Sequence, residues 1–448
     1  MALENQKFYE RKLVEASPNT LFDNAYIIDV ENNRVFKGQV LVSNGFIKEI
    51  IDLSKDKKIE KSTEVNYVDC KNLHLAPALI DAQVHIGEPG GDYKENLYLT
   101  SRSAVAGGVA TINIMPDTKP VIDTTALYEF IKNRAVEKSF CDITIFGSIT
   151  KNLEGKELSE MGLLKKAGIK GVSDCGNSIY DSLVFKRACE YASNFDLTIS
   201  HQPSDKFLSE NAVLADGFNS TTLGVQGVPD ISEKIGLERD LAIIEYVKAK
   251  YHCLNISTKK AIETIKNSKN KGLKITSSTT PEYFSFTDEE AKEYRTFAKL
   301  NPPLRSENDR FAIIEGLKNG AIDFISSNHS PRSVDQKRLP LQSAEFGVVG
   351  LETMLSASYT YLIKEGFELP QIFKLLSKNP AEYLGLKGQG AIKKGYKADL
   401  IIVDFSQEAI VNPLQFAGKA VNSLYDGIKL MGGVVKTFVS GKLVYEKN

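Results

Sequence analysis

Apolar runs and charged stretches alternate along the 448 residues of the chain. Between residues 76 and 388, short apolar runs typical of buried strands alternate with stretches of helical periodicity, at spacings typical of βα units. The strand-like runs lie near residues 80, 112, 145, 172, 199, 254, 276 and 325. Eight such runs are the number that closes a parallel (β/α)8 TIM barrel, so the pattern predicts an α/β fold of this kind.

The two ends of the chain carry a different pattern, in which apolar and polar residues alternate over short runs separated by turn residues. The alternating runs cover residues 25–30, 34–42, 46–51, 398–404 and 432–445. Alternation with a period of two is typical of antiparallel strands that bury one face. We therefore predict one small β-sandwich domain built from residues 1–75 and 389–448, attached to a barrel over residues 76–388.

Charge and cysteine usage exclude several classes of function. The chain has 56 basic and 57 acidic residues and a pI of about 6.6, so neither nucleic acid nor an anionic membrane is expected as a partner. No apolar run approaches the roughly 20 residues that span a bilayer, and the polar start M-A-L-E-N-Q-K is unlike a secretory signal. Five isolated cysteines form neither a disulfide framework nor a structural zinc motif. A cytoplasmic protein is expected.

Candidate chemistry lies at the ends of the predicted strands, where the active sites of parallel barrels are found. Polar side chains follow most of the apolar runs closely. They are Gln83, His85, Asp117, Asp174, His201, Asn255, Asn328 and His329.

Seven blocks carry a resemblance to a known family. They read D-A-Q-V-H-I-G-E-P-G, I-M-P-D-T-K-P-V-I-D, V-S-D-C-G, N-I-S-T-K, L-N-P-P-L-R, S-S-N-H-S-P and F-G-V-V-G-L-E-T. In this order they resemble the blocks of a dihydroorotase of the amidohydrolase superfamily, and most closely its inactive members. Members of this family have a TIM barrel that holds two zinc ions and hydrolyses a cyclic amide, so the resemblance implies the same fold and a related site here.

Several of the residues that the resemblance assigns to chemistry are replaced here. The family's first strand supplies two histidine ligands, and the corresponding positions are Gln83 and His85. An arginine that holds the substrate carboxylate is replaced by Gly87. Asp117 occupies the place of an asparagine that also meets this carboxylate, and an anion facing an anion repels it.

The remaining metal positions are also altered. Asp174 and Cys175 match an aspartate pair of which one member bridges the two zinc ions, and the sequence leaves open which of them it would be. His201 matches a histidine that begins a block of the family, Asn255 replaces another histidine, and Asn328 replaces the aspartate that is both metal ligand and general base. The residual ligand candidates are therefore His85, Asp174 and His201.

Other positions have ordinary structural interpretations. Asn301 matches a substrate-loop position of the family, although the shape of the backbone alone explains its presence. Cys175 is expected to fill the space of a lost carboxylate. His329 is expected to orient its neighbours, and Asp81 is expected to be a structural carboxylate at the barrel mouth.

Loss of the metal and of the base leads to the main hypothesis. Asn328 has no basic lone pair, so no catalytic residue and at most one weakly bound metal are expected. Buried carboxylates and imidazoles are costly without a cation, whereas amides can hydrogen-bond to one another. The resemblance then implies a non-catalytic protein of pyrimidine biosynthesis that acts as a structural partner of aspartate transcarbamoylase. The chain is also expected to form a homo-oligomer.

Two alternatives stay open at this point. One is a divergent cyclic amidohydrolase that binds a single metal through His85, His201 and either Asp174 or Cys175. The other is a metal-free sensor of a small molecule that uses the same pocket.

Overall fold

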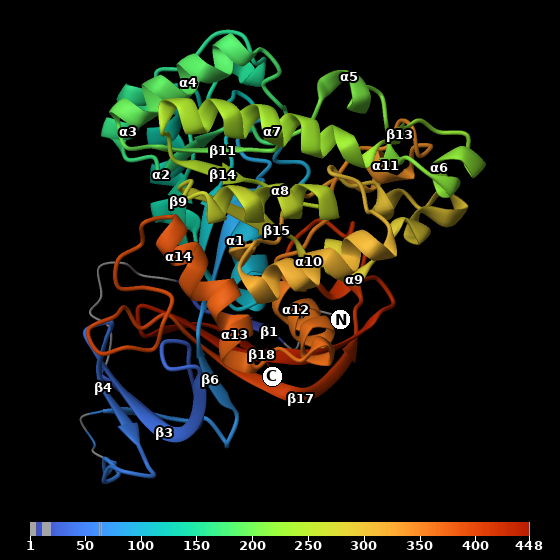
Figure 1. The fold of residues 1–448 in the computed structure, drawn as a ribbon. Coiled ribbons are helices and arrows are strands. Elements are labelled where there is room, and N and C mark those ends of the chain that lie inside the picture. Colours follow the sequence, from blue (N-terminus) through green and yellow to red (C-terminus); the bar gives the residue numbers. More distant parts are fainter. Residues whose placement is uncertain (1–5, 11–18, 62, 64, 448) are drawn as a thin grey trace.

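The computed structural model describes residues 6–10, 19–61, 63 and 65–447. The N-terminal segment in which no secretory signal is expected lies largely outside these residues. Figure 1 shows a barrel wrapped in helices that rests on a β domain, which is blue on one side and red on the other because both ends of the chain build it. This arrangement confirms the predicted fold class.

The barrel consists of eight parallel strands, one at each of the eight predicted runs. They are β7 (Leu79–Val84), β8 (Val109–Ile114), β9 (Asp142–Ile145), β10 (Gly171–Ser173), β11 (Thr198–His201), β14 (Tyr251–Cys253), β15 (Ile275–Thr279) and β16 (Phe324–Ile325). Neighbours in this order pair in parallel, and a bridge from Gly147 to Val172 joins β9 to β10. The bridge from Val84 to His329 closes the ring.

Helices cover the outside of the barrel (Figure 1). The longer ones are α1 (Leu97–Ala106), α2 (Thr125–Lys138), α3 (Met161–Ala167), α4 (Ser182–Asn194), α7 (Asp230–Val247), α8 (Lys259–Asn270), α10 (Glu307–Asn319) and α12 (Met354–Leu362). In α4, the Asp181 side chain accepts hydrogen bonds from the first-turn N–H groups, and Phe185, Ala188 and Ala192 lie on the buried face. None of the described helices is long and apolar enough to cross a membrane.

Short elements complete the loops at the barrel mouth and below it. They are α5 (Lys206–Ser209), α6 (Phe218–Thr222), α9 (Pro281–Ser285), α11 (Val334–Arg338), α13 (Leu369–Phe373) and α14 (Asn379–Tyr383), with a two-stranded sheet of β12 (Leu214–Ala215) and β13 (Gly227–Val228). Single helical turns lie at Lys151–Leu153, Asp288–Tyr294, Thr296–Ala298, Ile363–Glu365, Lys374–Lys378 and Pro413–Gln415.

The terminal domain contains a nine-stranded sheet in which strands from both ends of the chain interleave. Its strands are β1 (Gln6–Phe8), β2 (Thr20–Asp29), β3 (Arg34–Ser43), β4 (Phe46–Asp52), β5 (Asn66–Asp69), β6 (His74–Pro77), β17 (Leu400–Ile410), β18 (Lys429–Val439) and β19 (Lys442–Lys447). Strand β17 pairs with β6 and β1 pairs with β19. The rings of Phe22 and Phe438, one from each end, meet edge to face at 4.9 Å. Strand β6 carries this sheet as far as Pro77, beyond the boundary predicted at residue 75.

Candidate functional site at the barrel mouth

The polar residues predicted at the strand ends come together at one end of the barrel, because parallel strands deliver their C-terminal ends to the same face. At three of these ends the backbone has a left-handed conformation, with φ of 56° at Cys175, 52° at Asn255 and 49° at Asn328. This conformation is uncommon for a residue with a side chain and is enriched at functional sites. The strands therefore end in bends that set the direction of the side chains.

Two neutral amides occupy the positions at which the resemblance expects a metal ligand and the general base. The Gln83 side-chain N–H donates to Asn328 Oδ1 at 2.9 Å. Both side chains are buried, and Gln83 Oε1 has no hydrogen-bond partner among the described residues. Neither amide can accept a proton at neutral pH, so this pair cannot shuttle one between water and a leaving group.

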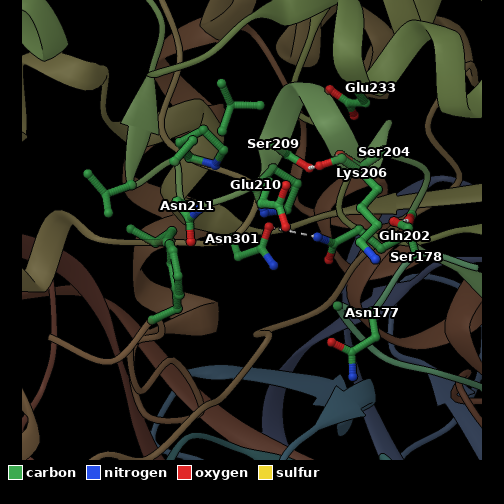
Figure 2. Close-up of a pocket in the computed structure, with 18 of the residues that line it drawn as sticks. Asn177, Ser178, Gln202, Ser204, Lys206, Ser209, Glu210, Asn211, Glu233 and Asn301 are labelled. Atoms are coloured by element: carbon green, nitrogen blue, oxygen red, sulfur yellow. Dashed lines mark hydrogen bonds between the residues drawn. The ribbon is translucent and has the colours of Figure 1, made fainter. Parts of the chain in front are cut away.

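A second chain of amides crosses the other side of the mouth. The Asn255 side-chain N–H donates to Gln202 Oε1 at 3.2 Å, and the Gln202 N–H donates to Asn301 Oδ1 at 3.0 Å. Figure 2 shows the second of these bonds between Gln202 and Asn301. The five side chains Gln83, Asn328, Asn255, Gln202 and Asn301 are called the amide network below. Gln202 was not among the candidate residues predicted from the sequence, and only the tertiary structure places it between Asn255 and Asn301.

His201 is a structural residue rather than a free metal ligand. Its Nδ1 lies 2.6 Å from Asp240 Oδ2, and its Nε2 accepts the Ile179 N–H at 2.9 Å. One donating and one accepting nitrogen is the pattern of a neutral imidazole. Both ring nitrogens of this ligand candidate are therefore engaged by protein groups. Asp240 lies far along the chain on α7, and no motif in the sequence pointed to it.

Asp174 also turns away from the mouth. Its Oδ1 accepts the N–H groups of Ile149 at 2.8 Å and Thr150 at 2.9 Å, and its Oδ2 accepts the Thr150 hydroxyl. Burial raises the pKa of this carboxyl above its ordinary value, although these hydrogen bonds oppose the shift. Asp174 thus anchors the loop after β9.

Cys175 takes the place that Asp174 leaves. Single ligand atoms of His85, Asp117 and Cys175 all lie within 4.8 Å of one another, and His85 Nδ1 is 2.7 Å from Asp117 Oδ2. These three residues are called the donor group below. Of the aspartate pair that the sequence left undecided, the second position is therefore the one that faces the site. Cys175 does more than fill space, because its thiol stands beside an imidazole and a carboxylate.

The electrostatics of the donor group differ from the expected repulsion of a substrate anion. Burial acts to raise the pKa of Asp117, but the electrostatic interaction and hydrogen bond with His85, together with the charge of Arg332, outweigh burial and lower the pKa. Asp117 Oδ1 is buried without a hydrogen-bond partner. Burial, assisted by the charges of Asp117 and Asp174, raises the pKa of the Cys175 thiol well above its ordinary value. Asp117 thus pairs with His85 within the protein.

Gly87, which replaces the substrate arginine of the family, leaves no room for any side chain. A Cβ at this position would lie 2.3 Å from Gly91 O and 2.4 Å from Glu95 O. The backbone of this loop therefore follows a path that excludes an arginine. Both the residue type and the backbone conformation at position 87 therefore rule out the family's substrate-binding arginine.

The structural roles expected for His329 and Asp81 agree with the geometry. His329 Nε2 lies 2.9 Å from Glu95 Oε1, and its Nδ1 is 3.4 Å from the Gly350 nitrogen. Asp81 accepts the N–H groups of Gln83 at 3.1 Å and Ser327 at 3.2 Å. Burial raises the pKa of Asp81 to about 6.

A cavity of about 860 Å³ opens beside the amide network. Gln202, Asn301, Lys206, Glu233 and Arg305 line this cavity. Figure 2 labels the first four of them. Lys206, Glu233 and Arg305 were not singled out from the sequence as site residues. Lys206 begins α5, Glu233 lies in the first turn of α7, and Arg305 ends the block L-N-P-P-L-R. The cavity offers many hydrogen-bonding groups, as a binding site for a polar molecule would.

The residues at the mouth do not fit the pair of zinc ions that the resemblance implies. Catalytic zinc is normally held by three protein ligands and one water. His201 and Asp174 are engaged elsewhere, while amides stand at positions 83, 255 and 328. The donor group is the single cluster of three or more His, Cys, Asp or Glu ligands found among the described residues. The arrangement can thus supply ligands for one metal ion but not for two.

Comparisons with known proteins agree with the geometry at the level of the fold and the family. A family model described as "Dihydro-orotase-like" matches residues 73–261, and one described as "Amidohydrolase family" matches residues 235–444. The chain is 40% identical over 434 residues to a dihydroorotase of Ehrlichia canis (strain Jake), with 96% of each chain covered. It is 38% identical over 425 residues to a dihydroorotase of Acetivibrio thermocellus, covering 95% of this chain and 98% of the relative.

Solved structures of lower identity share the same architecture. The L-hydantoinase (dihydropyrimidinase) of Arthrobacter aurescens matches with a TM-score of 0.85 at 22% identity, covering 96% of both chains. A D-hydantoinase matches with a TM-score of 0.82 at 19% identity, covering 96% of this chain and 95% of that one. Similarity at this level of sequence identity shows a common fold, whereas the chemistry depends on the residues of the site.

Proposed function

The chain belongs to the dihydroorotase family of the amidohydrolase superfamily, and we propose that within it the protein serves pyrimidine biosynthesis without hydrolysing dihydroorotate. In this proposal the barrel is a structural partner of aspartate transcarbamoylase. The observation that carries the first part is the 2.9 Å hydrogen bond between Gln83 and Asn328. It joins two neutral groups where hydrolysis would need a metal ligand and a base.

The chemistry of cyclic-amide hydrolysis explains why this pair matters. Ring opening requires a nucleophilic hydroxide, which a metal generates at neutral pH, and a group that carries a proton to the leaving nitrogen. Asn328 cannot carry the proton. His201 and Asp174 have their polar atoms engaged by Asp240 and by the loop after β9, so the ligand count for a second metal fails independently.

The substrate side of the site supports the same proposal. Dihydroorotate carries a carboxylate, which a cationic or hydrogen-bonding anchor must hold. Gly87 leaves no space for such a side chain, and the carboxylate of Asp117 faces His85. His85, the imidazole nearest to this position, is therefore already paired with a carboxylate of the protein.

Partnership with aspartate transcarbamoylase rests on the family resemblance alone. The hydrogen bonds between the amides are compatible with it, because they link the strand ends without a metal. A barrel that keeps its shape and loses its reaction can be retained for its surface.

One sample can test the loss of activity. The full chain is purified without chelator, its zinc content is measured, and turnover of dihydroorotate is followed in both the ring-opening and ring-closing directions. The dihydroorotase of Ehrlichia canis, prepared in parallel, serves as the positive control. We expect fewer than two zinc ions per chain and no turnover above background; turnover comparable to the control would disprove the proposal.

The partnership is tested separately by co-expression with the aspartate transcarbamoylase of the same genome. The two chains should elute together in size-exclusion chromatography, and the transcarbamoylase should lose activity when this chain is omitted. A protein that always elutes alone, beside a fully active transcarbamoylase, would contradict the partnership and leave the absence of hydrolysis standing.

A second candidate function is a divergent cyclic-amide hydrolase with a reduced metal site. The observations that favour it are the 40% identity to a dihydroorotase over nearly the whole chain and the presence of the donor group. Hydrolysis of hydantoin or dihydrouracil, cyclic amides without the carboxylate, would distinguish it from the first proposal. Metal-dependent turnover of either compound would favour this candidate.

A further inference from the structure

The donor group combines three kinds of metal-binding atom from three different strand ends. His85 follows β7, Asp117 follows β8 and Cys175 follows β10. Each offers one ligand atom, and the three atoms lie within 4.8 Å of one another. Tertiary structure alone brings them together, because they are far apart along the chain.

The spacing is close to what a single small cation requires. Zinc binds sulfur at about 2.3 Å and nitrogen or oxygen at about 2.0–2.2 Å, so donors in a tetrahedral shell stand roughly 3.3–3.7 Å apart. The separations now run from 2.7 Å, between the hydrogen-bonded His85 Nδ1 and Asp117 Oδ2, to at most 4.8 Å. Binding therefore requires that this pair separates and that the more distant donors approach, each by about 1 Å. Imidazole, carboxylate and thiolate together suit a borderline or soft ion such as Zn²⁺ or Co²⁺, whereas Mg²⁺ and Ca²⁺ prefer oxygen ligands.

A second observation comes from the carboxylate. Asp117 Oδ2 is bonded to His85, but Asp117 Oδ1 is buried and has no hydrogen-bond partner. A buried polar atom without a partner is costly, and such atoms in native proteins call for an explanation such as an ion. A cation beside this carboxylate would remove the cost.

The backbone conformation of Cys175 also supports a role of this residue as a ligand. Its φ of 56° lies in the left-handed region, and its N–H donates to Ser173 Oγ at 2.9 Å. A non-glycine residue in this conformation needs support from its surroundings. Here the support fixes the residue whose thiol faces His85 and Asp117.

We propose that His85, Asp117 and Cys175 bind one thiophilic divalent cation, Zn²⁺ or a close relative, in a mononuclear site that differs from the family's pair of zinc ions. On binding, the Cys175 S–H bond breaks, its proton passes to solvent, and the thiolate sulfur bonds the cation. The imidazole ligates as the neutral base and the carboxylate as the anion. The ion ties together the loops after β7, β8 and β10.

This inference goes beyond the proposed function and does not depend on it. Asn328 stands where the resemblance expects the general base, so an ion held by these residues gains no base from that position. A metal-loaded protein that does not turn over dihydroorotate is therefore the expected state.

Cobalt spectroscopy tests the site directly. The full chain is stripped of metal by dialysis against a chelator and titrated with Co²⁺, and the near-ultraviolet absorption is recorded. We expect a sulfur-to-cobalt charge-transfer band that saturates at one equivalent. Absence of this band in the wild-type protein would overturn the proposal without any variant.

Variants then assign the ligands. Cys175→Ser should abolish the band, and the matched control Cys189→Ser, which alters a buried thiol in α4, should retain it. Mutation of a residue that merely supports a metal ligand lowers metal affinity about 10- to 100-fold. Asp117→Asn removes a direct ligand, so it should weaken Co²⁺ binding more than 10-fold. Persistence of the band in folded Cys175→Ser, or unchanged affinity in Asp117→Asn, would also overturn the site.

Turnover measured on the same cobalt-loaded sample separates the two proposals. Activity toward dihydroorotate would contradict the proposed function and leave the metal site intact. A missing band without activity would remove the metal site and leave the proposed function intact.

Discussion

The donor group and the amide network share one barrel mouth but differ in the kind of side chain that each brings. The donor group keeps a titratable imidazole, carboxylate and thiol within 4.8 Å. The amide network consists of neutral side chains that hydrogen-bond to one another. Both groups leave buried oxygens without a hydrogen-bond partner among the described residues. They are Gln83 Oε1 and Asn255 Oδ1 in the amide network and Asp117 Oδ1 in the donor group, and only the last belongs to an ionisable side chain. The two parts of the mouth therefore differ in charge and in the chemistry that they can perform.

Behind the amide network, His201 has become part of a buried structural cluster. Asp240 accepts hydrogen bonds from Arg239 and from the Tyr251 hydroxyl, besides its contact with His201. Imidazole and carboxylate at this depth are stable only together. The comparison thus extends to a position at which the family resemblance expects a ligand and at which hydrogen bonds now join β11 to α7. The following predictions test it.

The largest effect is expected from Asp240→Ala. Removing this carboxylate leaves the buried His201 and Tyr251 and the partly exposed Arg239 without their partner, which should lower the free energy of unfolding by about 3–5 kcal/mol. Chemical denaturation measures the change. The control is Asp196→Ala, which breaks an exposed ion pair with Lys250 and should cost less than about 1 kcal/mol. Equal losses in the two variants would show that the His201 cluster is not structural.

Asn328→Asp is expected to have the next largest effect. The aspartate keeps the acceptor for Gln83 but buries a charge, so we expect a loss of about 2 kcal/mol at neutral pH. Adding Gln83→His should recover part of this loss through a new charged pair. A double-mutant cycle measures the coupling, expected at about 0.5–3 kcal/mol. Zero coupling would mean that the two positions act independently.

A change in pH dependence is expected from Asp81→Asn. Burial raises the pKa of Asp81 from 3.8 to about 6 in the folded protein. Its protonated form therefore contributes stability that is complete below pH about 3.8 and is lost as the pH rises through about 6. Between pH 5 and 7 the wild type should lose about 1 kcal/mol more than Asp81→Asn. Denaturation at both pH values checks this, and parallel pH profiles would contradict it.

The smallest effect is expected from Gln202→Ala. The substitution breaks two hydrogen bonds of the amide network, but Asn301 is exposed and the cavity admits water that can replace them. We expect a loss of about 0.5–1 kcal/mol. Thermal and chemical denaturation both report it. A loss as large as that of Asp240→Ala would show that this part of the mouth is as tightly coupled as the His201 cluster.

Local pattern was enough to predict the architecture. All eight barrel strands formed at the predicted apolar runs, and the alternating runs at both ends joined in one sheet. The period of the apolar positions and the residue types at the strand ends are local properties, so they could be read along the chain. Residue type also identified the loss of basic groups at positions 83, 255 and 328.

Contacts between distant segments could not be predicted in this way. The choice between Asp174 and Cys175 depends on a φ of 56° that turns Cys175 toward the mouth, while Asp174 faces the loop after β9. The role of His201 depends on Asp240, which reaches it from α7. Asp117 was expected to repel a substrate anion, and its proximity to His85 gives it a different partner.

The sequence by itself determined the barrel, the two-ended β domain and the chemical nature of each side chain at the mouth, because apolar periodicity and residue type are encoded locally. Only the tertiary structure decided which of those side chains meet. Hydrogen bonds and metal ligation act over a few ångströms, and the direction in which each strand end bends selects which groups lie within that range.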